Sequence, residues 1–300
     1  MPTTTETLRI LEPHPAVFAY YDGRIHGKRL HSSADNWLDD GAYALGVASY
    51  AIVDGTEALV YDTHISLEHA KAIRAHLESL GVQHIRVVLS HWHKDHVAGN
   101  GAFADCEILS LKLTAERLLQ NRQKIEQADP PISPLVMPNA TFEDSLHLTI
   151  GRRRVELHHF AIHSADGNVV FLPEQGLLLA GDTLEDTVTF ISEALEIGTH
   201  VRELERMKTF PIAKILPAHG DHARIAAGGY SPTLIHANQS YLQRLRNALA
   251  MEEDVDSSLE RFVAPEIASG AVLYFVPYEA VHRSNIAAVK DVMPILSRDS

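Results

Sequence analysis

Three histidines and one aspartate lie within six residues of each other, in the segment Ser90-His91-Trp92-His93-Lys94-Asp95-His96. Since His91 and His93 are two positions apart, an extended segment projects both imidazoles to the same side. A turn after His93 can then bring Asp95 and His96 round to the same place. Imidazole and carboxylate groups are ligands that Zn²⁺ prefers. The spacing therefore predicts a metal site built on this segment.

The same segment resembles the His-x-His-x-Asp-His signature of the metallo-β-lactamase superfamily. Further candidate ligands follow in the order of that family, and the resemblance covers roughly residues 45–245. These candidates are His163, the aspartate of Gly181-Asp182, and the histidine of Pro217-Ala218-His219-Gly220. The resemblance implies an α/β protein with an αββα sandwich fold, in which the metals sit at one edge of the two sheets.

The resemblance also assigns each ligand to a metal. His91, His93 and His163 would hold the first metal, Asp95, His96 and His219 the second, and Asp182 would bridge the two. We expect two zinc ions per chain, with iron or manganese as alternatives. Asp95 and Asp182 are also the predicted catalytic residues, because a carboxylate there can orient a hydroxide or pass a proton to the leaving group.

Such a site suggests hydrolysis. Two divalent cations about 3.5–4 Å apart generate a hydroxide near neutral pH and polarise a carbonyl or phosphoryl oxygen. A nucleophilic side chain is then not needed. We interpret the chain as a binuclear, zinc-dependent hydrolase that uses a metal-bound hydroxide on a small-molecule lactone, ester, thioester or amide.

Other functions of the same superfamily stay open. A single-iron sulfur dioxygenase would resemble the chain in its first-metal ligands but would leave the second site empty, whereas every second-site ligand type is present here. A nuclease would need a basic channel or an added nucleic-acid domain, and neither is visible. A non-catalytic binding protein is disfavoured by the intact set of ligands.

β-Lactamase activity is a further alternative. The run His163-Ser164-Ala165-Asp166-Gly167 resembles the true zinc β-lactamases. The commonest of these enzymes, however, carry a cysteine where Asp182 stands, and soon after it a lysine that grips the carboxylate of the drug. Here Glu185 and Asp186 follow instead, and we expect them to repel a carboxylate. Lactones and esters therefore rank ahead of β-lactams as predicted substrates.

Several residues outside the ligand set are candidates for supporting roles. Asp62 ends a predicted strand beside the motif and could hydrogen-bond a ligand imidazole. Trp37, Trp92 and Tyr230 could line the substrate pocket, which the sequence alone does not decide. The predicted loops that shape the pocket span residues 31–42, 128–140 and 183–200.

The elements that must position these residues follow from turn signals and apolar periodicity. Asp54-Gly55 predicts a hairpin turn, and Ser66 and Gly81 predict the two ends of a helix. Strands are predicted at 85–90, 168–173, 177–182 and 213–217, and helices near 198–209, 232–250 and 278–296. We expect one domain over residues 1–300, with about 255–300 packing as a helical extension.

The amino-acid composition limits the classes of binding partner that we expect. The net charge of −13 argues against nucleic-acid binding, and the single cysteine excludes an internal disulfide and a thiolate-rich zinc site. No apolar run approaches about 18 residues, so no membrane partner is expected. The amino terminus lacks the pattern of a secretory signal, which predicts a cytoplasmic protein. The expected partner is a small-molecule substrate, with a homodimer as a possible assembly.

Overall fold

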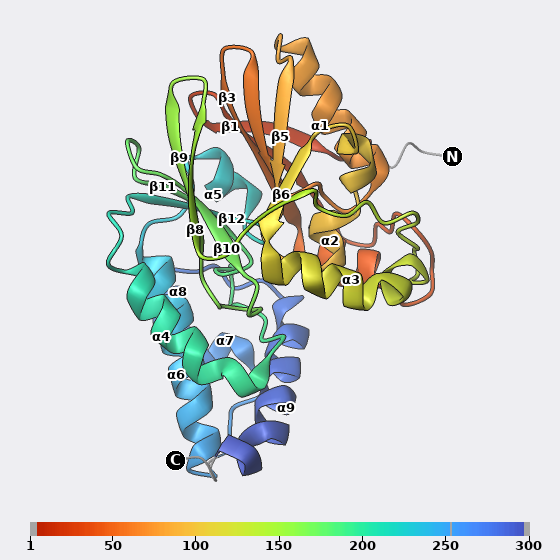
Figure 1. Ribbon diagram of the computed structural model, residues 1–300. Helices are drawn as coiled ribbons and strands as arrows, with labels where there is room; N and C mark the ends of the chain where they lie inside the picture. The colour runs from red at the N-terminus through yellow and green to blue at the C-terminus, as the bar shows by residue number, and fades with distance from the viewer. Residues whose placement is uncertain (1–4, 253, 297–300) are drawn as a thin grey trace.

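Two β-sheets face each other and carry helices on their outer sides (Figure 1). This computed structural model describes residues 5–252 and 254–296. The seven-stranded sheet runs in chain order, and its strands are β1 (Arg9–His14), β2 (Val17–Asp22), β3 (Val47–Asp54), β4 (Glu57–Tyr61), β5 (His84–Val88), β6 (Glu107–Leu111) and β7 (Ala140–Phe142). Strands β1 to β4 pair antiparallel, and β4 to β7 pair parallel.

The second sheet has five strands in the order β12-β11-β10-β9-β8. They are β8 (Ser145–Ile150), β9 (Arg153–His159), β10 (Asn168–Leu172), β11 (Leu177–Gly181) and β12 (Lys214–Pro217). Only β11 and β12 pair parallel among these described strands. The predicted strands are therefore present, with ends that differ by one or two residues.

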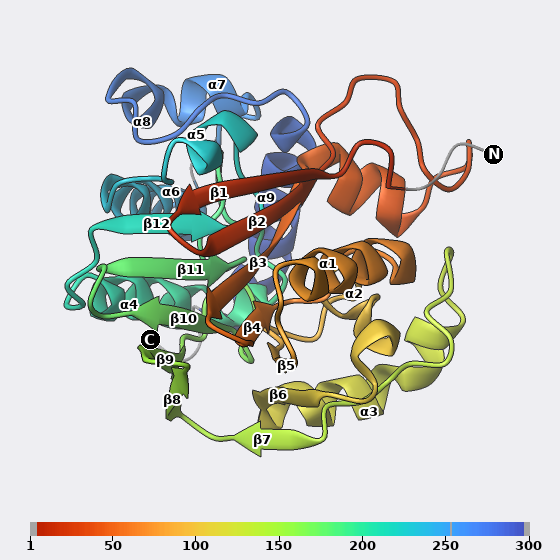
Figure 2. The same cartoon turned by 90° about the horizontal axis from the view of Figure 1, so that it is seen from above.

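Helices cover both outer faces, as the view from above makes clear (Figure 2). The helices are α1 (Leu67–Ser79), α2 (Lys94–Val97), α3 (Lys112–Glu126), α4 (Ile197–Met207), α5 (His222–Ala226), α6 (Thr233–Ala250), α7 (Leu259–Phe262), α8 (Ala264–Ala268) and α9 (Tyr278–Leu296). Three helical segments are of other types: η1 (Trp37–Tyr43) is a π-helix, and η2 (Asn100–Phe103) and η3 (Ala194–Glu196) are 3₁₀ helices. The predicted α/β sandwich of the αββα type is confirmed.

Two apolar clusters account for this layering. One contains Tyr50 and Tyr61 of the first sheet, Leu179 of the second, and residues of α4 and α6 such as Leu204 and Leu242. The other joins the outer face of the first sheet to α1 and α3. Burying apolar surface between layers is the main favourable term in folding, so these clusters hold the sheets in the register that the site requires.

Helix α1 shows how the sequence sets a boundary. The Ser66 hydroxyl accepts a hydrogen bond from the backbone N–H of His69, which satisfies one of the free donors at the helix start. Gly81, with φ of +87°, allows the chain to leave the helix. Both predicted ends are confirmed.

The C-terminal helix α9 has the predicted bounds and packs against α6 and η3. Asn285 on α9 accepts a hydrogen bond from Ile191 N and donates one to Thr189 O. Helix α9 thereby fixes the loop between β11 and η3. The final residues of the predicted extension, 297–300, lie outside the described residues. Within the described ranges, no helix has both the length and the apolar character that a membrane span needs.

Candidate metal centre

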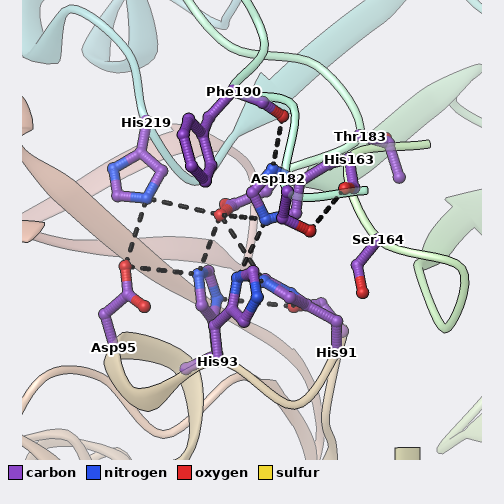
Figure 3. A network of polar contacts seen from close by, with 12 residues as sticks. His91, His93, Asp95, His163, Ser164, Asp182, Thr183, Phe190 and His219 are labelled. Carbon is purple, nitrogen blue, oxygen red and sulfur yellow. Dashed lines mark hydrogen bonds and ion pairs between the residues drawn. The ribbon is translucent and has the colours of Figure 1, made fainter. Parts of the chain in front are cut away.

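All seven predicted ligands lie at one edge of the two sheets. His91 and His93 follow β5, and Asp95 and His96 belong to α2. His163 follows β9, Asp182 follows β11, and His219 follows β12. The close-up shows His91, His93, His163, His219 and Asp95 arranged around the carboxylate of Asp182 (Figure 3). Residues from both sheets therefore meet at a single point.

The side chains form two groups that could each hold a cation. Within each group, the candidate ligand atoms lie within 4.8 Å of one another. The groups are His91, His93, His163 and Asp182, and Asp95, His96, Asp182 and His219. Asp182 belongs to both, which is the arrangement expected of a bridging ligand.

The first group brings three imidazole nitrogens into close contact. His93 Nδ1 lies 2.9 Å from His91 Nε2 and also 2.9 Å from His163 Nε2. A neutral imidazole nitrogen carries either one proton or one lone pair, so it cannot make two full hydrogen bonds. A cation bonded to all three nitrogens removes this conflict, and the donor set therefore fits a metal.

The second group is organised by carboxylate oxygens. Asp182 Oδ2 lies 3.2 Å from His96 Nε2 and 3.5 Å from His219 Nε2, and Asp95 Oδ2 lies 3.3 Å from His219 Nε2. Asp182 Oδ1 is buried and has no hydrogen-bond partner among the described residues. Burying an unpaired carboxylate oxygen is costly, so a cation there would satisfy it.

Hydrogen bonds on the far side of the rings fix the imidazoles. His96 Nδ1 contacts Asp62 Oδ2 at 2.8 Å, His163 Nδ1 contacts Phe190 O at 2.9 Å, and His219 Nδ1 contacts Gly46 O at 2.6 Å. A proton on each outer nitrogen leaves a lone pair on the inner one, ready to bind a metal. The predicted partner role of Asp62 is confirmed by its contact with His96.

Electrostatics also suit a cation. Burial, and then the neighbouring histidines, lower the pKa of His91 and bring that of His93 to about 3, so both imidazoles are neutral. Burial opposes ionisation of Asp95 and Asp182, but the positive charge of His96 and His219 outweighs it and holds both carboxyl pKa values well below the ordinary value. The same carboxylates raise the pKa of His96 and of His219 against the effect of burial, so a cation bound there would take the place of the protons on these two imidazoles. Neutral imidazoles and ionised carboxylates are the forms that bind metal.

Backbone strain is concentrated at this edge. Asp62 and His163 have φ angles of +66° and +68°, in the left-handed region that L-residues rarely adopt. Gly181, with φ of +53°, lies directly before Asp182, and a Cβ there would come within 2.8 Å of the Tyr61 hydroxyl. Such conformations cost free energy and persist where the surrounding structure enforces them. The chain is thus held in a fixed, unfavourable conformation where it presents these ligands.

A cavity of about 430 Å³ opens onto the ligands. Its wall is largely apolar and is drawn from η1, the motif, the loop after β11, and α9. The apolar lining includes Trp37, Ala42, Leu45, Trp92, Phe190, Pro277, Ala280 and Val281. Trp37 and Trp92 therefore do line the cavity. The contribution of α9 to the cavity wall was not predicted, because no local sequence signal shows that residues 277–284 fold back across the site.

The structure answers the open question of Tyr230, and two of our expectations about the surroundings need correction. Tyr230 does not line this cavity, because its hydroxyl donates to Asp186 Oδ2 instead. Asp186 is buried away from the cavity, where it also accepts from Leu273 N. The predicted loop 128–140 lines a neighbouring cavity of about 730 Å³, which shares Trp37 with the first.

Glu185 does line the main cavity, but its carboxylate is already engaged. Its two oxygens accept hydrogen bonds from Phe190 N at 2.8 Å and from the Tyr278 hydroxyl at 2.9 Å. Burial, and next the nearby Asp182 carboxylate, raise the pKa of Glu185. Asp186 is therefore not placed to repel a substrate in this cavity, whereas repulsion of a substrate carboxylate by Glu185 stays a prediction.

Comparisons with known proteins agree with this geometry. A family model described as the metallo-beta-lactamase superfamily matches residues 42–219. The chain is 22% identical over 177 residues to a beta-lactamase-like protein 2 homolog of Caenorhabditis elegans. It is 27% identical over 177 residues to an atrochrysone carboxyl ACP thioesterase of Emericella nidulans. These matches cover 58% and 59% of this chain, and 56% and 52% of the relatives. The chain thus spans about half the length of these relatives.

Among solved structures, a metallo-beta-lactamase from Pontibacter korlensis superposes with a TM-score of 0.61. The sequence identity is 18%, and the match covers 79% of this chain and 99% of that chain. At this level of identity the likeness concerns the fold. The part of the chain after residue 219, which supplies α9 and its share of the cavity wall, lies outside the family match.

Proposed function

The chain belongs to the metallo-beta-lactamase superfamily, a family of metal-dependent hydrolases, and from that premise we propose that it hydrolyses a small-molecule lactone, ester, thioester or amide with two zinc ions. The observation that carries the proposal is the pair of ligand groups that share Asp182. When bound, the two cations would supply Lewis-acid activation of the substrate and a nucleophile derived from water near neutral pH. Iron or manganese would suit the same donor set.

The proposed residue roles follow from position and charge. His91, His93 and His163 would hold one cation, Asp95, His96 and His219 the other, and Asp182 would contribute to both. Asp95 and Asp182 are the acid–base candidates. Both carboxylates line the cavity, and Asp95 is partly exposed there, so it would take a proton from the attacking water and deliver it to the leaving group.

The cavity wall supports an acyl substrate. Trp92, Phe190 and Val281 form an apolar surface that would bind a hydrocarbon portion and exclude bulk water. The hydrogen bonds behind the imidazoles keep the ligands in place, so little rearrangement would be needed at the moment of reaction. The thioesterase among the relatives makes thioesters a natural first class to test.

The test is a hydrolysis panel on protein of measured metal content. We expect two metal ions per chain and turnover of at least one class among lactones, esters, thioesters and amides. β-Lactams and phosphodiesters belong in the panel as competing classes. A single iron per chain, with sulfur-substrate oxidation and no hydrolysis, would instead indicate a sulfur dioxygenase and would refute the proposal.

The matched variant for this test is Asp95→Ala. Loss of one ligand and one proton carrier should lower kcat by about 10²-fold or more, while circular dichroism remains that of the parent. Asp105→Ala, which removes an exposed carboxylate paired with Arg74 outside the cavity, serves as the control. Activity of the Asp95 variant within about threefold of the parent would exclude the catalytic role.

A further inference from the structure

One cationic side chain in the cavity forms no salt bridge within the described residues. Lys94 lies inside the motif, is half-buried, and lines the cavity beside Trp37. Its Nζ lies 5.7 Å from the centre of the Trp37 ring, which is a cation–π contact. In the described part of the chain, no hydrogen bond or ion pair joins this ammonium to another side chain.

The acidic residues of the same cavity are engaged elsewhere. Asp40 binds the guanidinium of Arg29 through both of its oxygens, at 2.5 and 2.8 Å. Glu185 accepts from Phe190 N and the Tyr278 hydroxyl. Asp95 directs Oδ2 towards His219. Lys94 is thus the one ammonium or guanidinium group among the described residues that line the cavity, and no carboxylate there forms a salt bridge with it, although the neighbouring Asp95 attracts it electrostatically.

The indole of Trp37 is held beside this ammonium. Its Nε1 donates a hydrogen bond to Pro130 O at 2.9 Å, and Trp37 begins the helical segment η1, which Asn36 caps through its side chain. A fixed aromatic face and an unpaired ammonium therefore stand together at the cavity wall. Pockets of this kind use a few placed polar groups to orient a ligand that is otherwise bound by apolar contacts.

We propose that Lys94, packed on Trp37, is a specificity-determining residue that binds an oxyanion of the substrate away from the bond that is cleaved. The substrate is then an acyl compound with an apolar part and a carboxylate or phosphate group. This inference rests on the proposed function. A hydrogen-bonded ion pair formed in a half-buried setting is stronger than a neutral contact, so it can select among acyl compounds.

The experiment compares matched thioesters on the metal-loaded protein. N-acetylcysteamine thioesters of pentanoate and glutarate have acyl chains of equal length and differ in one terminal carboxylate. A pentanoyl thioester with a phosphorylated leaving group places the oxyanion on the other side of the cleaved bond. The quantity measured is the ratio of kcat/KM for each anionic thioester to that for the neutral one, in the parent, Lys94→Met and Lys124→Met.

Lys124 provides the control, because it is an exposed lysine of α3 near Lys94 that does not line the cavity. We expect Lys94→Met to lower the ratio for one anionic thioester about tenfold or more, and Lys124→Met to leave it within about twofold. The affected compound shows whether the oxyanion lies on the acyl group or on the leaving group. Unchanged ratios, or equal losses in both variants, would overturn the inference.

A binding measurement separates this inference from the proposed function. If the parent hydrolyses none of these thioesters, the proposal of thioester hydrolysis is refuted. Calorimetric titration with glutarate and pentanoate then still tests whether Lys94 binds an oxyanion. Both acids carry one carboxylate that can meet the metals, and only glutarate carries a second. Tighter binding of glutarate by the parent, lost in Lys94→Met and retained in Lys124→Met, supports the inference. Equal binding of the two acids by the parent contradicts it.

Discussion

At the scale of single residues, Asp62 lies outside the proposed ligand set but contacts one of its imidazoles. It is buried, its Oδ2 contacts His96 Nδ1 at 2.8 Å, and its Oδ1 accepts from Ser90 N at 2.6 Å. One carboxylate therefore fixes both the imidazole and the backbone at the start of the motif. Residues behind metal ligands commonly set how tightly the metal is held.

We predict that Asp62→Asn weakens metal binding at the site that includes His96. An amide can donate to Nδ1, which favours the tautomer whose inner nitrogen is protonated. The dissociation constant of one of the two metals should rise about 10–100-fold. Competition titration with a chromophoric chelator measures this change. Asp54→Asn, at the far end of β3, is the control, and equal affinities in the two variants would contradict the assigned role.

His200 gives a second prediction at this scale, one that concerns pH. Both of its ring nitrogens are buried without a hydrogen-bond partner among the described residues. Burial, and to a lesser extent His163, lower the pKa of His200 to about 3, below its unfolded value of about 6.5. Between these two values the unfolded chain binds the additional proton, so His200 makes the folded state less stable as pH falls.

His200→Leu should remove this contribution. The free energy of unfolding of the variant should equal or exceed that of the parent at pH 7. The difference should grow on acidification below pH 6.5, by at most about 1.4 kcal/mol per pH unit. Denaturant unfolding of both proteins at pH 7 and pH 5 measures it. Parallel pH profiles would show that His200 is not buried in its neutral form.

Some features of the candidate site were predicted from the sequence, and others were not. The motif residues are close in the chain, and the structure brings all seven predicted ligands together, although their binding of metal stays a prediction. The partnership of Asp62 was also foreseen, because a strand end beside the motif strand must lie near it. The unpaired state of Lys94 was not, because it depends on where Arg29 and Tyr278 place the neighbouring hydrogen bonds.

At the scale of elements, the contact between α2 and the end of β4 is unusually close. Thr63 N donates to His96 O at 2.8 Å, and Gly99 follows Ala98, the C-cap of α2. A Cβ built on Gly99 would lie 2.0 Å from Thr63 O and 2.4 Å from Ala70 Cβ. The position of α2, and with it of Asp95 and His96, thus requires a residue without a side chain.

We predict that Gly99→Ala destabilises the protein by about 2–4 kcal/mol, since backbone on one side and a packed helix on the other leave no room for a methyl group. Chemical denaturation measures the loss. Gly101→Ala is the matched control, because a Cβ there meets only Leu67 Cδ1 at 3.3 Å. If both variants unfold at the same denaturant concentration as the parent, the close approach is not present in solution.

The elements with strong local signals were predicted well. Helix α1 has its serine cap, and β10, β11 and α9 have clear apolar patterns. Strand β5 ends at Val88 instead of residue 90, because Ser90 N turns to the Asp62 carboxylate and leaves the ladder. The segment η1 was predicted as a loop, because its seven residues are too few to show helical periodicity.

At the scale of the whole molecule, the proposed ligands come from both sheets. His91, His93, Asp95 and His96 come from the seven-stranded sheet and its connections, whereas Asp182 and His219 follow strands of the five-stranded sheet. A cation bound by both sets would link the layers, and its binding free energy would add to the stability of the fold.

We therefore predict that removal of metal with a chelator lowers the melting temperature by about 5–10 °C. This is the shift expected when the free metal concentration is about a thousand times its dissociation constant. Differential scanning calorimetry measures the shift, and readdition of zinc should reverse it. His219→Ala should show a smaller shift, since one of the groups is incomplete. Identical melting curves with and without metal would contradict a link between the sheets.

Part of the cavity wall comes from a stretch of chain that carries none of the proposed ligands and can change separately over evolutionary time. Residues 91–219 carry every proposed ligand, whereas Pro277, Ala280, Val281 and Ser284 line the cavity and belong to neither candidate metal-binding group. Substitutions in α9 can alter the shape of the cavity while the chemistry stays intact. A lineage could therefore acquire new substrates by drift in its last helix, and chains with the same motif should diverge there first.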